Sequence, residues 1–272
     1  MRSDRNICLG VSSCRLLSLY RFVRFTVVAN CLWYGFFAMG VCAQTVSDGR
    51  SETQIRQTAN REANCKILYA GIVGALETSN NKRSGVVQIR NTLNGPGYPD
   101  VCAKSFSPYT WMSGRRWILE HFPSHPGPMT EDELRRSPKV ILVGHSAGGW
   151  AVLSVARDLS QKNIPVELTI QIDSVGITDR TIPENVRAGA IFHARDILVF
   201  LTTKKIKTEP ASQTKLLANV RVKGVGHESI TRDPRIREMV LCEVDSLRAS
   251  DSLVLSPAQD TVGAPSGGCS SH

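Results

Sequence analysis

One stretch of twelve residues, 139–150 (KVILVGHSAGGW), constrains the fold of this chain more than any other. It opens with a run of aliphatic, mostly β-branched residues, which is typical of a short strand buried on both faces of a sheet. Ser146 follows at the centre of a Gly-x-Ser-x-Gly pattern, and small or helix-forming residues come next. The stretch therefore predicts a strand, a sharp turn that carries the serine, and a helix.

The glycines on either side of the serine fit this prediction. A strand and a helix that meet at so sharp a turn pass close to each other, so the residues two before and two after the serine must be small. Gly144 and Gly148 occupy those two positions. A helix is expected over 147–159, where apolar residues recur at helical spacing.

Elsewhere in the chain, apolar runs alternate with segments of helical character. We expect strands at 66–70, 101–106, 140–143, 166–172, 188–193 and 220–223, and helices at 109–122, 131–136, 147–159 and 233–247. Residues 77–100 read as a loop that contains a short β-type run at 86–89. Such alternation predicts an α/β fold, a mostly parallel sheet with helices on both faces.

Reactive side chains follow the ends of three predicted strands. Ser146 follows the strand at 140–143, Asp173 ends the strand at 166–172, and His227 lies on a glycine-flanked loop after the last strand. The carboxyl ends of parallel strands converge on one crevice, so these residues are expected to meet there. A histidine can take the proton of a serine hydroxyl, and a carboxylate can orient that histidine.

Together, the turn, Ile172-Asp173-Ser174-Val175-Gly176 and Gly224-Val225-Gly226-His227 resemble the α/β-hydrolase superfamily, in particular its serine lipases and esterases. The resemblance covers about residues 65–247. It implies a single domain of that type over 65–248, with Ser146 as nucleophile and His227 as general base. Asp173 is the favoured acid, and Asp196, which follows the next strand as the acid does in most members, is the alternative.

The resemblance also implies an oxyanion hole. The N–H group of Ala147, next after the nucleophile, is the first expected donor, and the N–H group of Ile72, after the first strand and Gly71, is the second. The His-Gly-Gly-Gly stretch of one esterase branch does not occur in the chain.

The N-terminal region has the pattern of an export signal. Five arginines precede an uncharged run over 26–43 that ends in Val41-Cys42-Ala43, so we expect a signal peptide over 1–43 that is cleaved after about Ala43. The run is also close to the minimum length of a membrane-spanning helix, so an uncleaved anchor is the alternative. Both interpretations place the enzyme domain outside the cytoplasm, as a secreted, periplasmic or anchored protein. Residues 44–64 read as a linker and 249–272 as a disordered tail.

Cysteine usage agrees with export. Four of the eight cysteines lie beyond residue 43, at Cys65, Cys102, Cys242 and Cys269, which allows up to two disulfides. The fold implied by the resemblance starts adjacent strands at Cys65 and Cys102, which favours that pair. No Cys-x-x-Cys or His-Glu-x-x-His motif indicates a metal site.

Charge excludes one class of partner. Without residues 1–43 the chain has 28 basic and 23 acidic residues, a net charge of +5 that is scattered along the sequence. Nucleic-acid binders concentrate positive charge on one face, so no nucleic-acid partner is expected. A membrane contact is expected only through the N-terminal segment, if that segment stays attached.

The sequence thus predicts an exported serine hydrolase that cleaves small acyl esters through a Ser-His-Asp triad, with no cofactor and no metal. A thioesterase or amidase with the same triad is one alternative, and a non-catalytic hydrolase-fold binding protein is another. Nothing in the sequence indicates an oligomeric state.

Overall fold

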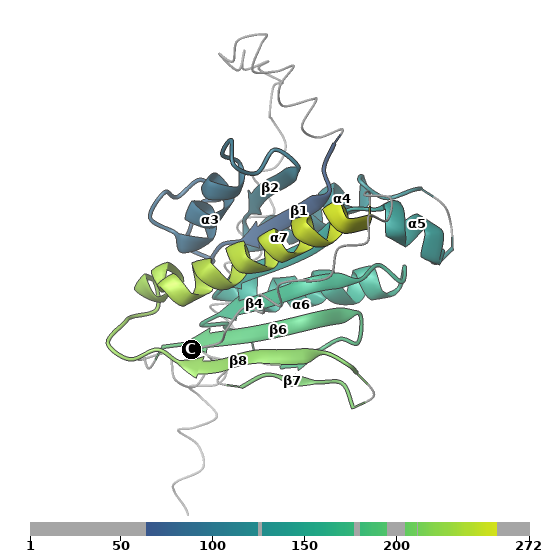
Figure 1. Cartoon of the computed structure of the whole chain (residues 1–272). Helices are drawn as coiled ribbons and strands as arrows, with labels where there is room; N and C mark the ends of the chain where they lie inside the picture. Colours follow the sequence, from purple (N-terminus) through teal and green to yellow (C-terminus); the bar gives the residue numbers. More distant parts are fainter. Residues whose placement is uncertain (1–63, 125–126, 177–179, 195–204, 211, 255–272) are drawn as a thin grey trace, which may run out of the picture. The chain divides into compact units, whose positions relative to one another are not determined.

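The computed structural model describes residues 64–124, 127–176, 180–194, 205–210 and 212–254. Helices and strands alternate along most of this length (Figure 1). In chain order they are β1 (Ile67–Ile72), α3 (Gly85–Leu93), β2 (Val101–Phe106), the 3₁₀ turn η1 (Pro108–Thr110), α4 (Trp111–Leu119), α5 (Glu131–Arg136), β3 (Lys139–His145), α6 (Ala147–Ser160), β4 (Val166–Ile172), β5 (Thr181–Ile182), β6 (Val186–His193), β7 (Lys207–Thr208), β8 (Lys215–Arg221), the 3₁₀ turn η2 (Ser229–Arg232) and α7 (Pro234–Val254).

Six of the strands form one sheet in the order β2-β1-β3-β4-β6-β8, and every neighbouring pair is parallel. β3, which leads to Ser146, is an inner strand between β1 and β4. The carboxyl ends of β3, β4 and β6 therefore lie beside one another at one edge of the sheet. The predicted fold class, a mostly parallel sheet, is confirmed.

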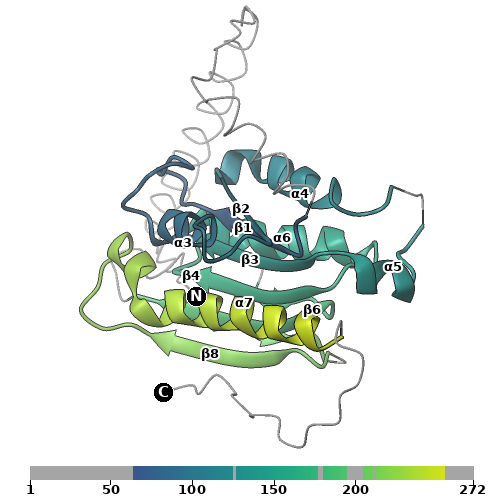
Figure 2. The ribbon, with the colours of Figure 1, turned by 45° about the horizontal axis from the view of Figure 1, so that its top comes forward.

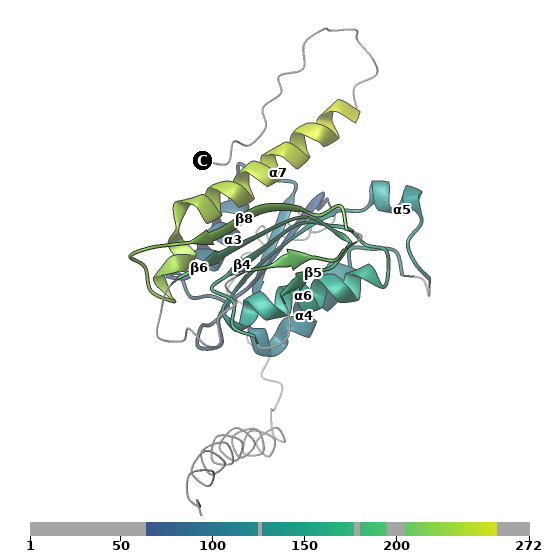
Figure 3. The ribbon, with the colours of Figure 1, turned by 90° about the horizontal axis from the view of Figure 1, so that it is seen from below.

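Helices cover both faces of this sheet, as predicted (Figure 3). Alternate residues of a strand point to opposite faces, and the hydrophobic core divides in the same way. One half of the core contains Tyr69 with side chains of α3 and α7, and the other contains Leu68 with side chains of α4 and α6. In Figure 2, α7 lies over one face of the sheet, and it contacts β4.

The segment after β1 differs from the sequence-based prediction. Residues 86–89 were expected to form a β-type run in a loop, but they belong to helix α3, whose apolar side chains Val86, Val87 and Ile89 are buried against the sheet. A short apolar run has the same composition in a buried helix and in a strand, which explains the error.

Gly71 was expected just after the first strand, but it lies inside β1. A Cβ atom there would meet the Cγ1 atom of Val86 at 2.5 Å. The hydroxyl group of Tyr69 donates to the main-chain oxygen of Val86 at 3.0 Å. The missing side chain at Gly71 therefore lets α3 pack closely on the sheet.

Two predicted boundaries near the C-terminus were wrong. β8 begins at Lys215 rather than at residue 220, and α7 continues to Val254, past the predicted start of the tail at 249. β8 is an edge strand with exposed and half-buried residues, and its first half has an apolar run of only three residues, Leu216, Leu217 and Ala218. α7 buries Ile236, Val240 and Val244 at a spacing of four, and Ser and Ala residues continue the helix beyond them.

A disulfide joins Cys65 to Cys102, with the two Cα atoms 5.6 Å apart. Cys65 precedes β1 and Cys102 lies in β2, and these strands are neighbours in the sheet. The predicted pairing is confirmed, and the disulfide links the start of the described chain to the edge strand of the sheet.

Several predictions fall on residues outside the described ones. These are the signal peptide or anchor over 1–43, the linker up to residue 63, and the tail from 255 onward. Asp196 and Cys269 also lie there. Within the described ranges, no helix combines the length and the apolar character needed to cross a membrane.

Candidate active site

Ser146 occupies the turn between β3 and α6, where the sequence predicted it. Its backbone has φ 54° and ψ −122°, a conformation that residues other than glycine rarely adopt. Strained backbone of this kind persists only where the surrounding structure imposes it, and it is concentrated at functional sites. The strain at Ser146 is therefore an observation in favour of a chemical role.

Two close backbone contacts explain the glycines beside the serine. A Cβ atom on Gly144 would lie 2.1 Å from the main-chain oxygen of Gly148, and one on Gly148 would lie 2.2 Å from the main-chain oxygen of Ile72. Rigid backbone atoms cannot yield to such contacts. The helix can approach the sheet this closely only because both positions lack a side chain.

Hydrogen bonds fasten the serine turn to the end of β4. The N–H group of Ser146 donates to the main-chain oxygen of Ile172 at 2.9 Å, and the N–H group of Val175 donates to the main-chain oxygen of Ser146 at 3.0 Å. Asp173 lies between these two partners in the sequence. The same contacts that hold Ser146 therefore hold the main chain on either side of Asp173.

Asp173 is fully buried and is the second strained residue of the site, with φ 42°. Its N–H group donates to the main-chain oxygen of Phe192 at 2.7 Å, and its Oδ1 atom accepts from the N–H group of Ala194 at 3.1 Å. These bonds orient the carboxylate and leave Oδ2 to face the loop that carries His227.

His227 completes the contact. Its Nδ1 atom lies 2.6 Å from Oδ2 of Asp173. A carboxylate accepts, so Nδ1 carries the proton, and in a neutral ring Nε2 is then the basic nitrogen. The structure thus pairs the predicted base with the favoured acid, Asp173, whereas the alternative acid, Asp196, lies outside the described residues.

The two predicted oxyanion donors are placed differently. Ala147 is the first residue of α6, and its N–H group has no acceptor among the described residues, as an oxyanion donor requires. Ile72 is the last residue of β1 and pairs with Phe106 and Gly144 on its two sides. The N–H group of Val73 donates to Phe106, and N–H directions alternate along a strand, so the N–H group of Ile72 points towards β3.

The N–H group of Ile72 therefore belongs to the sheet, and its role as second donor stays a prediction. Gly74, which the sequence analysis did not single out, is a further option. It lies beyond the paired part of β1, and within the described ranges nothing accepts its N–H group. A Cβ atom on Gly74 would lie 3.0 Å from Nδ1 of His145, which places this glycine beside the serine turn.

Sequence reasoning missed a second ionisable pair at this site. Nδ1 of His145 lies 2.5 Å from Oε1 of Glu77, and Nε2 of His145 lies 2.8 Å from the main-chain oxygen of His227. Burial alone would raise the pKa of Glu77, but its interactions with His145 and Ser84 and the charge of His227 lower that pKa below its ordinary value. Residue spacing could not reveal this pair, because 68 residues separate its members.

The arrangement of these residues on the sheet decides the fold type. A serine on the strained turn after an inner parallel strand, an aspartate at the end of the next strand in the sheet, and a histidine on the loop after the last strand follow the chain order Ser, Asp, His. This order and this placement are those of the α/β-hydrolase fold. The chain has an α/β-hydrolase fold.

Comparisons with known proteins returned solved structures only. No protein-family model matches the chain, and a search of curated proteins found no relative. Solved structures with a similar fold have low identity to this chain. They include the thioesterase RedJ from the prodiginine biosynthetic pathway of Streptomyces coelicolor (10% identity, 67% of this chain and 92% of that one, TM-score 0.40), Est1E from Butyrivibrio proteoclasticus (14%, 70% and 90%, 0.37) and XC6422 from Xanthomonas campestris, described as a serine hydrolase without a lid (14%, 65% and 81%, 0.36). Likeness at this level carries no information about a substrate of this chain.

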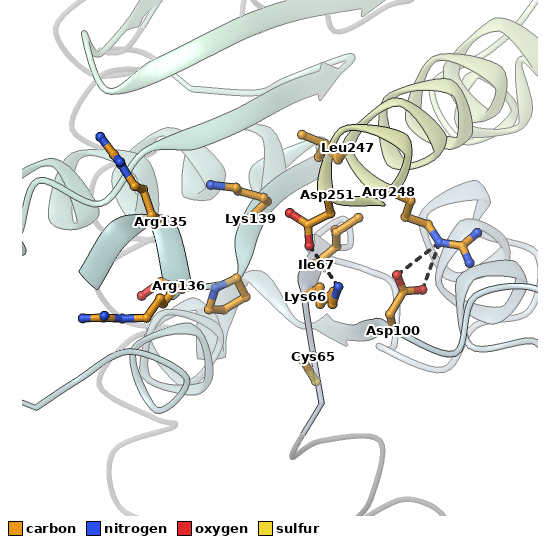
Figure 4. A pocket seen from close by; sticks show the side chains of 12 residues that line it. Cys65, Lys66, Ile67, Asp100, Arg135, Arg136, Lys139, Leu247, Arg248 and Asp251 are labelled. Carbon is orange, nitrogen blue, oxygen red and sulfur yellow. Dashed lines mark hydrogen bonds and ion pairs between the residues drawn. The ribbon is translucent and has the colours of Figure 1, made fainter. Parts of the chain in front are cut away.

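A separate cavity of about 420 Å³ lies at the end of the sheet where the strands begin, away from their carboxyl ends. It is beside the first residues of β1 and β3 (Figure 4). Charged side chains line it, and two ion pairs neutralise part of that charge, Lys66 with Asp251 at 3.2 Å and Arg248 with Asp100 at 2.9 Å. None of the proposed catalytic residues contributes to this cavity. In the described part of the chain, no group of three or more His, Cys, Asp or Glu side chains is placed to hold a metal ion.

Proposed function

We propose that this chain is an exported serine hydrolase that cleaves carboxylic esters through an acyl-enzyme. The observation that carries the proposal is the hydrogen bond between buried Asp173 and His227, on a fold that presents Ser146 on a strained turn. A carboxylate held against Nδ1 keeps the basic nitrogen of the imidazole at Nε2, and that nitrogen is the one that can take a proton from a serine.

In this proposal, His227 Nε2 removes the proton of the Ser146 hydroxyl as its oxygen attacks the ester carbonyl carbon. The carbonyl oxygen becomes negative in the tetrahedral intermediate, and the N–H group of Ala147 donates to it. The imidazolium then protonates the leaving alcohol, and the acyl group stays on Ser146. Water, activated by His227 in the same way, releases the acid and restores the serine.

Apolar side chains near the site favour a substrate with an apolar portion. Leu76, Tyr109 and Met112 are 96%, 74% and 63% exposed, on the segments that follow β1 and β2. Leu76 adjoins Glu77, which contacts His145, and Trp111 packs against Trp150 of α6 with ring centroids 6.2 Å apart. An apolar acyl chain that lay along these segments would cover side chains that water otherwise contacts.

Hydrolysis of short p-nitrophenyl esters by the purified protein tests the proposal. We expect Ser146→Ala to lower kcat by about 10⁴-fold or more, because the remaining groups cannot form an acyl-enzyme. Ser154→Ala makes the same change within α6, away from the turn, and should leave kcat unchanged. Equal turnover by the wild type and Ser146→Ala would refute the proposal, and a series of acyl chain lengths would test the apolar preference.

Thioesters and amides react through the same groups, so they belong in the same assay as alternative substrates. Export is supported by the N-terminal pattern and by the Cys65–Cys102 disulfide, which forms in oxidising compartments. Sequencing the N-terminus of the mature protein tests this part. A start at Gln44 is expected, and an intact residue 1–43 segment would favour the anchor instead.

A further inference from the structure

The pair formed by Glu77 and His145 lies directly behind the proposed catalytic base. The His145 side chain is 2% exposed and that of Glu77 is 11% exposed. The imidazole of His145 faces an oxygen with each of its nitrogens, Glu77 Oε1 on one side and the main-chain oxygen of His227 on the other. Its ring centroid lies 4.8 Å from that of His227.

Counting protons defines what this histidine does. A main-chain oxygen only accepts, so Nε2 of His145 must donate to His227. One further proton lies between Nδ1 and Glu77 Oε1, so each nitrogen of His145 is hydrogen-bonded to an oxygen. Through this bond Glu77 keeps the ring in the orientation in which Nε2 faces the loop.

The loop that carries His227 needs such support. It lies between β8 and η2 and contains Gly224 in a left-handed conformation, φ 74°. Asp173 fixes the ring of His227 through Nδ1, but that bond alone does not fix the main chain from which the ring projects. The bond from His145 supplies a second point of attachment, on the backbone of the same residue.

The far end of the loop is held independently. The N–H group of Gly85, at the start of α3, donates to Oγ1 of Thr231 at 3.1 Å, and Arg232 donates to the main-chain oxygen of Arg83 at 3.1 Å. These contacts do not involve Glu77. Changing Glu77 should therefore alter the position of His227 without detaching the loop from the domain.

From this geometry we propose that Glu77 and His145 are positioning residues that hold the main chain of the catalytic base, so that its ring can face both Asp173 and Ser146. The inference rests on the proposed function, because it assigns His227 as the base. Glu77 and His145 would thus support the triad, and their link to it is the main-chain oxygen of His227.

Two substitutions at Glu77 in the full chain test the proposal. In Glu77→Gln the side-chain amide can donate to Nδ1 of a neutral His145, which keeps its Nε2 proton for His227, so most of the wild-type kcat should remain. Glu77→Ala leaves Nδ1 without a partner and frees the ring to turn. A misplacement of the base by about 1 Å typically costs about 10²-fold, so we expect a loss of that size in kcat with little change in KM.

Thermal unfolding of each variant establishes that it is folded, and Glu77→Leu, which fills the space without either oxygen, replaces Ala if Ala does not fold. A wild-type kcat in the Ala or Leu variant would overturn the inference. A Gln variant that loses as much kcat as Ala would also overturn it, because the hydrogen bond would then not be what matters.

A second readout does not depend on activity. The proton between His227 Nδ1 and Asp173 should give a downfield NMR signal, assigned by its absence in His227→Gln. We expect this signal to persist in Glu77→Gln and to broaden or disappear in Glu77→Ala. An unchanged signal in Glu77→Ala would refute the positioning role. A wild-type protein that does not hydrolyse esters would refute the proposed function, but the effect of Glu77 on the NMR signal would still hold.

Discussion

At the scale of single residues, the account depends on which carboxylate serves His227. Asp173 is buried, strained in its backbone and 2.6 Å from Nδ1 of the histidine. Replacing it with asparagine keeps the size of the side chain but lets the imidazole adopt the wrong tautomer. A kcat lower by about 10⁴-fold is expected in Asp173→Asn, measured by ester hydrolysis.

Asp196→Asn is the matched control for this substitution. The superfamily resemblance made Asp196 the alternative acid, so the two variants discriminate the assignments directly. We expect Asp196→Asn to retain the wild-type kcat. The reverse result, with activity lost only in Asp196→Asn, would transfer the role of acid to Asp196.

The lowered pKa of Glu77 predicts how stability depends on pH. Folding lowers this pKa, so the ionised carboxylate stabilises the folded state fully above the ordinary pKa of a glutamate, about 4.3. The stabilisation is lost as the pH falls through the folded-state pKa. Denaturant unfolding at several pH values below about 5 should therefore show a steeper fall in the free energy of unfolding for the wild type than for Glu77→Gln. Parallel curves for the two proteins would contradict this prediction.

At the scale of elements, the close approach of β1, β3 and α6 depends on glycines. A Cβ atom on Gly148 would lie 2.2 Å from backbone of β1, so Gly148→Ala must push the helix from the sheet. Overpacking of this kind costs about 1–3 kcal/mol in the free energy of unfolding, and it should also displace Ser146 and lower kcat.

Gly97→Ala provides the comparison. No atom lies within 4 Å of a Cβ built at Gly97, so its stability should stay within about 0.5 kcal/mol of the wild type. Chemical denaturation of both variants measures the difference. Equal stability of the two would show that the contact at Gly148 relaxes at no cost.

Some helices and strands could be predicted from sequence patterns, and others could not. The strands β2 and β4 were predicted to the residue, since each contains buried apolar residues and has clear breakers around it. α3 and the first half of β8 were missed. The apolar run of α3 is too short to distinguish helix from strand, and β8 is an edge strand with exposed residues, whose first half has an apolar run of only three residues, 216–218.

The site was predictable to a similar extent. Ser146, Asp173 and His227 follow strand ends, and strand ends in a parallel sheet converge, so the contact between Asp173 and His227 could be expected without coordinates. Glu77 could not be found in this way. It lies in a loop, and its contact with His145 depends on how that loop folds back over the serine turn, which no local pattern specifies.

At the scale of the whole molecule, the Cys65–Cys102 disulfide closes a loop with a sequence separation of 37 residues. Closing a loop of this length restricts the unfolded chain and is worth about 3–4 kcal/mol in the entropic model. The double variant Cys65→Ser, Cys102→Ser should lose about that much free energy of unfolding in a denaturant titration. The serine turn lies elsewhere in the sheet, so the folded variant should keep its kcat, and a stability equal to the wild type would contradict the prediction.

The central claim is that Ser146 is a nucleophile activated by His227 and Asp173, and covalent labelling tests it most directly. The folded protein is treated with a fluorophosphonate probe, and the modified peptide is located by mass spectrometry. The account predicts one adduct, on Ser146, that forms much more slowly in Asp173→Asn and is absent in Ser146→Ala. A folded wild-type protein that carries no adduct on Ser146 would contradict the account.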